Sequence, residues 1–87
     1  MIWWVVFSPQ AAADAAHVAA AGLKPRALEL LALLGRDPLA ASPPFATLQG
    51  DLSGAHSRRL DLRQQLVYEV LREERVVRVL SLWTHHD

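Results

Sequence analysis

Two adjacent histidines, His85 and His86, stand at the end of the printed sequence in the stretch LWTHHD, after an apolar run at 76–80. They suggest three explanations: the remnant of a purification tag, a metal-binding pair, or a catalytic imidazole delivered by the end of a strand. A tag does not follow a tryptophan-containing strand and end on an acid. A metal pair is disfavoured because adjacent side chains on an extended segment point to opposite faces. Which role the histidines have depends on the rest of the chain.

The composition restricts the class of protein. Its 87 residues allow one domain, spanning 1–87, and 52% of them are apolar, although many of these are alanines at 11–21. The absence of cysteine excludes a disulfide scaffold and a thiolate zinc site, and it favours a cytoplasmic protein. The apolar run at 2–7 is too short to cross a membrane and follows no charged leader. We expect a cytoplasmic protein without membrane association, metal or cofactor.

The charges are balanced in number but uneven in distribution. Nine basic residues oppose nine acidic ones, so the overall field gives no argument for nucleic acid as a partner. Six of the eight arginines lie at 58–78, however, and arginine suits bidentate contact with phosphate. Composition alone favours the simpler interpretation, in which these arginines belong to a solvated strand face with Arg–Glu pairs.

Local signals predict the elements that would carry these residues. Residues 2–7 are β-branched and aromatic, which predicts a strand. Ser8 is a natural N-cap and Pro9 a natural first helical residue, so a helix is expected over 10–21, with Gly22 ending it. A second helix is expected from Lys24 to Gly35. Its apolar stripe should face the core, and consists of Ala27, Leu28, Leu30, Leu31 and Leu34.

The second half of the chain predicts a sheet. Prolines and glycines mark 36–54 as a loop, and three strands are expected at about 55–61, 65–71 and 75–83. The last two strands should form a hairpin around 72–74. The resulting order is β-α-α-β-β-β, which predicts an α+β domain with a helical hairpin packed on a twisted antiparallel sheet.

Several motifs resemble one known family. The stretch LQGDLSGAHSRRL at 48–60, LVY at 66–68 and WTH at 83–85 resemble the YoeB/Txe toxins of type II toxin–antitoxin systems, in the RelE-like superfamily. That family carries an L-x-G-x-L-x-G-x-x-S-R-R element, a strand with R-L-V-Y and a terminal histidine followed by an aromatic residue. The expected order of elements agrees with its RelE-like microbial ribonuclease fold.

The resemblance implies a ribosome-dependent endoribonuclease that cleaves messenger RNA through attack of the ribose 2′-hydroxyl. His85 matches the family's general acid, and His86 occupies the place of the aromatic residue, from which it can stack on a base or donate a hydrogen bond. Arg58 and Arg59 match the arginines that lie near the RNA. The implied partners are the ribosome, messenger RNA and a cognate antitoxin of the YefM/Phd type, with operator DNA reached only through that antitoxin.

Three positions depart from the family pattern. Ala46 replaces the glutamate base, Gln65 replaces the arginine that binds phosphate, and Gln49 replaces a lysine-like residue. The resemblance therefore leaves Gln65 and Gln49 as neutral substrate-binding positions. Loss of a general base costs roughly 10²–10⁴ in rate. The alternative function is a catalytically impaired relative that binds an antitoxin and acts as a co-repressor.

Overall fold

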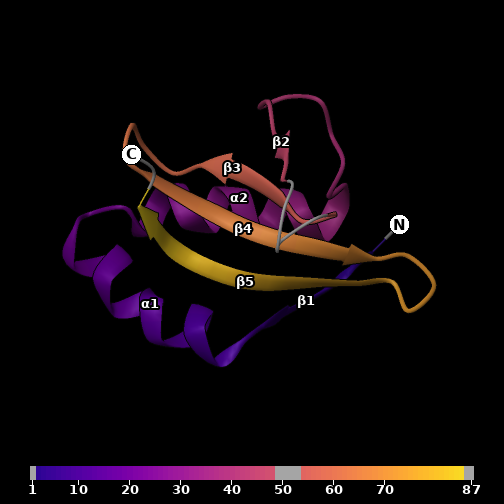
Figure 1. Ribbon diagram of the computed structural model, residues 1–87, viewed down its shortest axis with the longest axis horizontal. Coiled ribbons are helices and arrows are strands. Elements are labelled where there is room, and N and C mark those ends of the chain that lie inside the picture. Colours follow the sequence, from indigo (N-terminus) through magenta and orange to yellow (C-terminus); the bar gives the residue numbers. More distant parts are fainter. Residues whose placement is uncertain (1, 49–53, 86–87) are drawn as a thin grey trace.

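The computed structural model describes residues 2–48 and 54–85, which form two helices and one sheet of five strands (Figure 1). The strands lie in the order β1-β5-β4-β3-β2. Along the chain the elements are β1 (Trp4–Phe7), α1 (Pro9–Ala20), α2 (Lys24–Arg36), β2 (Ala46–Thr47), β3 (His56–Arg59), β4 (Gln64–Leu71) and β5 (Val76–His85).

The predicted signals at the helix ends are confirmed. The Ser8 hydroxyl accepts a hydrogen bond from the Ala11 N–H at 3.1 Å, and Pro9 is the first residue of α1. Gly22 lies in the connection between the helices with φ of +74°, a left-handed conformation that glycine adopts at little cost. Neither helix of the described residues is long and apolar enough to cross a membrane.

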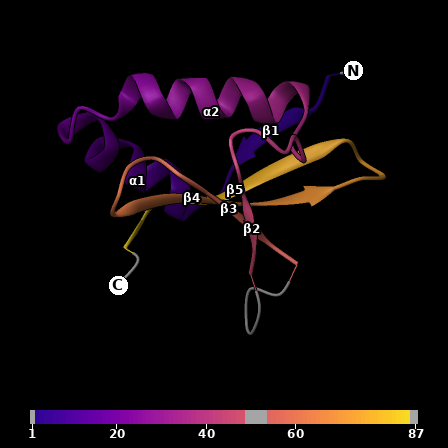
Figure 2. The same ribbon diagram turned by 90° about the horizontal axis from the view of Figure 1, so that it is seen from above.

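Both helices lie against the same face of the sheet, and α2 runs across it in Figure 2. The core forms where the two layers meet, so the expected α+β architecture with a helical hairpin is confirmed. The buried residues of this core come from α1, α2, the turn after β3, β4 and β5, and include Val18, Leu30, Leu34, Leu60, Leu66, Tyr68, Val77 and Val79.

The sheet is mixed, whereas a purely antiparallel sheet was expected. The strand β1 pairs in parallel with β5, with Trp4 opposite Val76 and Phe7 opposite Val79. Parallel strands cannot be joined by a tight turn and need a crossover connection. The helical hairpin and the strands between Phe7 and Val76 supply that connection, so β1 can enter the sheet beside the last strand.

A short strand lies within the segment predicted as a loop at 36–54. Ala46 and Thr47 form β2, which pairs antiparallel with Ser57 and His56 of β3. Two residues carry no periodic pattern, and Pro43 and Pro44 immediately before them are typical of loops. The strand exists because β3 offers it a free edge, a long-range property that the local sequence does not encode.

Leu28 does not belong to the buried stripe of α2. Its side chain is 54% exposed, whereas Ala27, Leu30 and Leu34 are buried as predicted. The reason is a groove between the two helices, which Leu28 lines together with Phe7. The helices diverge enough to leave this residue outside the core.

Candidate functional site

The pairing of three strands brings the predicted site positions together. Gln65 of β4 lies opposite Arg59 of β3 on one side and opposite Thr84 of β5 on the other. The next position along, Gln64, lies opposite His85. The sheet therefore places the backbone of the terminal histidine one step from the rung that holds Arg59 and Gln65.

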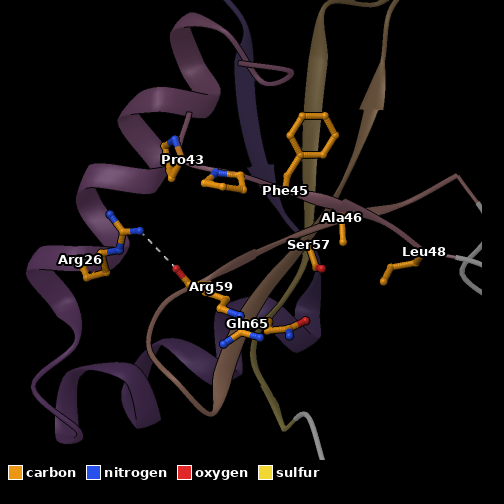
Figure 3. Close-up of a pocket in the computed structure, with 9 residues that line it drawn as sticks. Arg26, Pro43, Phe45, Ala46, Leu48, Ser57, Arg59 and Gln65 are labelled. Carbon is orange, nitrogen blue, oxygen red and sulfur yellow. Dashed lines mark hydrogen bonds between the residues drawn. The ribbon is translucent and has the colours of Figure 1, made fainter. Parts of the chain in front are cut away.

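A cavity of about 490 Å³ opens beside this rung (Figure 3). Three of its lining residues were predicted from the sequence to belong to the site, namely Ala46, Arg59 and Gln65. Figure 3 shows the Arg59 and Gln65 side chains close together, with Ala46 on the neighbouring strand. The remaining lining residues are Arg26, Pro43, Pro44, Phe45, Leu48 and Ser57.

Arg26 is a cavity residue that the sequence analysis missed. It projects from the first turn of α2, and its Nη2 group donates a hydrogen bond of 3.5 Å to the Arg59 carbonyl oxygen (Figure 3). Its Nη1 group pairs with Glu29 at 3.3 Å on the same helix. No motif marks Arg26, because its place at the cavity depends on how α2 packs beside β3.

Arg58 lies in the interior, although it was predicted to bind substrate. Its residue is 1% exposed, and its guanidinium donates to the Tyr68 hydroxyl at 3.0 Å. It also donates to backbone carbonyl oxygens of the loop before β2, those of Pro38 at 3.1 Å, Ala40 at 2.8 Å and Pro43 at 2.5 Å. With these bonds made, the Arg58 side chain does not reach the cavity, and the structure argues against its predicted role.

The alternation of a strand explains why two neighbouring arginines behave so differently. Arg58 and Arg59 are adjacent on β3, so their side chains point to opposite faces of the sheet. Arg58 is turned toward the helices and Arg59 is exposed at the cavity. The alternation rule could have shown from sequence that only one of the pair faces the substrate, but not which one.

His56 contacts Phe45, a residue of the cavity lining, but does not itself line the cavity. Its Nδ1 atom lies 3.1 Å from the Thr47 hydroxyl, and its ring meets the Phe45 ring edge-on at 5.2 Å between centroids. Burial, with smaller contributions from the charges of Arg58 and Arg72, lowers the pKa of His56 below its usual value of 6.5. The neutral imidazole is therefore the form that the fold accommodates.

Among the described residues, no group of three or more histidines and acids could hold a metal ion. Two of the predicted positions, Gln49 and His86, lie outside the described residues.

Comparison with known proteins finds similar solved structures, although searches by sequence find no match. No protein-family model and no curated protein matches the chain. Solved structures do match. A YoeB/ParE toxin from Agrobacterium tumefaciens is 22% identical with a TM-score of 0.83, over 95% of this chain and 99% of that one. The YoeB dimer from Staphylococcus aureus is 26% identical with a TM-score of 0.80, over 99% of this chain and 100% of that one.

The chain has the fold of the YoeB-like toxins of the RelE superfamily. The resemblance read from the motifs is thus confirmed. A more distant match carries the fold alone: YafQ in the Escherichia coli DinJ–YafQ toxin–antitoxin complex is 19% identical, with a TM-score of 0.79 over 98% of this chain and 94% of that one.

In this YoeB-like chain, α1 fixes the course of the last strand. The register between β4 and β5 shifts twice, between Gln65 and Val67 and between Val67 and Tyr68. The buried carboxylate of Asp14 accepts hydrogen bonds from the N–H groups of Leu82 and Trp83, at 3.0 and 3.2 Å. These contacts hold β5 just before Thr84 and His85, and no local pattern around Asp14 predicts them.

Proposed function

We propose that this YoeB-like chain is the toxin of a type II toxin–antitoxin module and acts as an endoribonuclease on messenger RNA at the ribosome. The observation that carries the proposal is the cavity beside the rung of Arg59, Gln65 and Thr84, to which β5 delivers the backbone of His85. A cationic side chain and an amide side chain thus line one cavity, and the backbone of the candidate acid lies one position away along the sheet.

The proposed reaction needs no redox partner. The 2′-hydroxyl gives up its proton to solvent water as its oxygen attacks the adjacent phosphorus. The bond from phosphorus to the 5′-oxygen breaks, and a 2′,3′-cyclic phosphate and a free 5′-hydroxyl result. His85 supplies the proton to the departing 5′-oxygen. Arg59 stabilises the negative charge that grows on the phosphoryl oxygens. Gln65 and Gln49 donate amide hydrogen bonds to the substrate, and His86 stacks on a base or donates a hydrogen bond.

Ala46 makes cleavage slower than in a relative with a complete set of residues. It lines the cavity where the resemblance places a glutamate base, and a methyl group cannot accept the proton of the 2′-hydroxyl. Loss of a general base costs roughly 10²–10⁴ in rate. Together with Gln65, this observation favours a second candidate function, that of an impaired relative that binds an antitoxin and acts as a co-repressor.

The partners follow from the same proposal. The solved relatives include a heterotetrameric YoeB–YefM complex from Staphylococcus aureus and the DinJ–YafQ complex. We propose a cognate antitoxin of the YefM/Phd type for this chain, with operator DNA contacted only through that antitoxin. The place of action is the cytoplasm, on ribosomes and their messenger RNA.

Inducible expression with mapping of messenger-RNA ends tests the proposal. The unaltered chain should arrest growth and produce cleavage in translated messages, and His85→Ala should abolish both while still co-purifying with the antitoxin. The double variant Ala46→Glu with Gln65→Arg should cleave faster than the unaltered chain. Cleavage that persists at full rate in His85→Ala would contradict the proposed acid. No cleavage by either the unaltered chain or the double variant would instead favour the co-repressor function.

A further inference from the structure

We propose that Arg26 and Arg59 together form a phosphate subsite in the cavity, which takes a phosphodiester group of single-stranded RNA. The inference rests on the proposed function and deepens it, because it names the group that holds the substrate where Gln65 lacks a charge. Arg26 has no counterpart among the motifs that suggested the function.

The two guanidinium-bearing residues reach the cavity from different layers of the fold. Arg26 comes from α2 and Arg59 from β3, and both line the same cavity of about 490 Å³ with Gln65 (Figure 3). The hydrogen bond from Arg26 Nη2 to the Arg59 carbonyl oxygen ties the helix residue to the strand. The subsite is therefore held by the packing of α2 on the sheet and does not depend on a single strand.

The electrostatics of the cavity favour an anion. None of its nine lining residues is acidic, whereas two are arginines. The carboxylate that pairs with Arg26 belongs to Glu29, whose side chain is 70% exposed, and such exposed pairs contribute little. The pairs with Glu29 and the Arg59 carbonyl engage two of the five N–H donors of the Arg26 guanidinium. Donors thus remain that can bind two oxygens of one phosphate.

The rest of the lining fits a nucleotide better than a bare ion. Pro43, Pro44 and Phe45 form an apolar side of the cavity, against which a ribose or base can pack. Gln65 and Ser57 add neutral hydrogen-bonding groups. A cavity with arginines and an apolar wall is the combination that single-stranded nucleic acid requires, since its backbone is anionic and its bases are flat and apolar.

The test is binding of a short single-stranded RNA by fluorescence anisotropy over a range of salt concentrations. The oligonucleotide carries 2′-O-methyl sugars, whose blocked 2′-oxygen cannot attack phosphorus, so that binding is measured without cleavage. Arg26→Ala should weaken binding about tenfold, as expected for loss of a charge-assisted hydrogen bond. The slope of log K against log salt should fall by about 0.7, the contribution of one phosphate contact in a single strand. Arg26→Lys should keep most of the slope, because it keeps the charge.

Arg36→Ala is the matched control, since Arg36 is exposed on the same helix but does not line this cavity. It should leave the slope unchanged. If Arg36→Ala and Arg26→Ala weaken binding equally, the effect is one of overall charge and the subsite is overturned. If Arg59→Ala weakens binding and Arg26→Ala does not, the role of Arg26 fails while the proposed function stands. If neither variant changes binding, the phosphate subsite is overturned, while the proposed function is still decided separately by the cleavage mapping with His85→Ala.

Discussion

Asp14 of α1 holds Leu82 of β5 in place through a hydrogen bond of 3.0 Å from the Leu82 N–H to the Asp14 carboxylate. The same carboxylate oxygen accepts the Trp83 N–H, and its second oxygen accepts from the Gln10 side chain at 2.7 Å. Asp14 is 4% exposed, so these bonds replace water that the buried group has lost. Asp14 thereby supplies a hydrogen-bond acceptor for two N–H groups of β5 at the point where the pairing of β5 with β4 is irregular.

Replacing Asp14 should therefore destabilise the fold. Asp14→Ala leaves the Leu82 and Trp83 N–H groups without their acceptor, at a cost of about 1–3 kcal/mol for each buried unsatisfied group. Asp14→Asn keeps an acceptor oxygen and should cost less. Urea unfolding at neutral pH measures both variants, with Glu73→Ala at an exposed acidic position as control. Equal stability of Asp14→Ala and the unaltered chain would contradict the role of this carboxylate.

Arg58 and Arg59 should respond to substitution in opposite ways. Arg58→Met removes the buried donor to Tyr68 and to three backbone carbonyls, with a loss of about 4 kcal/mol if each of the four bonds contributes about 1 kcal/mol. Arg59→Ala changes an exposed side chain and should alter the free energy of unfolding by less than about 0.5 kcal/mol.

The measurement pairs chemical unfolding with RNA binding for both variants. Arg59→Ala should lose RNA affinity while remaining as stable as the unaltered chain. A stable Arg58→Met protein with weakened RNA binding would show that Arg58 acts on the substrate, as first predicted from the sequence.

Stability should fall on mild acidification because of His56. The pKa of His56 is lowered in the folded state, so the unfolded chain binds this proton first as the pH falls. The contribution of His56 to the free energy of unfolding is fully present above about pH 6.5, which is the pKa expected in the unfolded chain. It is lost as the pH falls toward the lower pKa of the folded state. His56→Gln cannot titrate, so its midpoint of urea unfolding should change less between pH 7.5 and 5.5. An identical change in both proteins would rule out His56 as the cause.

Ser8 joins two parts of the fold with one hydroxyl. It caps α1 by accepting the Ala11 N–H, and it donates to the Leu80 carbonyl of β5 at 2.8 Å. Ser8→Ala should lower the free energy of unfolding by about 1–2 kcal/mol, as for other caps replaced by alanine. Ser8→Asp keeps the cap but cannot donate to Leu80. Its stability should therefore lie between that of the unaltered chain and that of Ser8→Ala. Thermal unfolding compares them with the exposed Ser42→Ala, which should behave like the unaltered chain.

Local signals in the sequence were enough to predict both helices. Ser8, Pro9 and Gly22 set the ends of α1, and the apolar spacing after Lys24 specified α2, because caps, breakers and periodicity act within one or two turns. The motifs at 48–60, 66–68 and 83–85 were enough to indicate the YoeB-like fold. They also showed that Ala46 and Gln65 depart from the family pattern.

Which residues contact one another across the fold could not be predicted from these local signals. The parallel pairing of β1 with β5 and the short strand β2 depend on edges that distant segments provide. Burial divided Arg58 from Arg59, and packing brought Arg26 to the cavity and Asp14 to the last strand. These outcomes are set by contacts between residues far apart along the chain, and no local pattern of residue types records them.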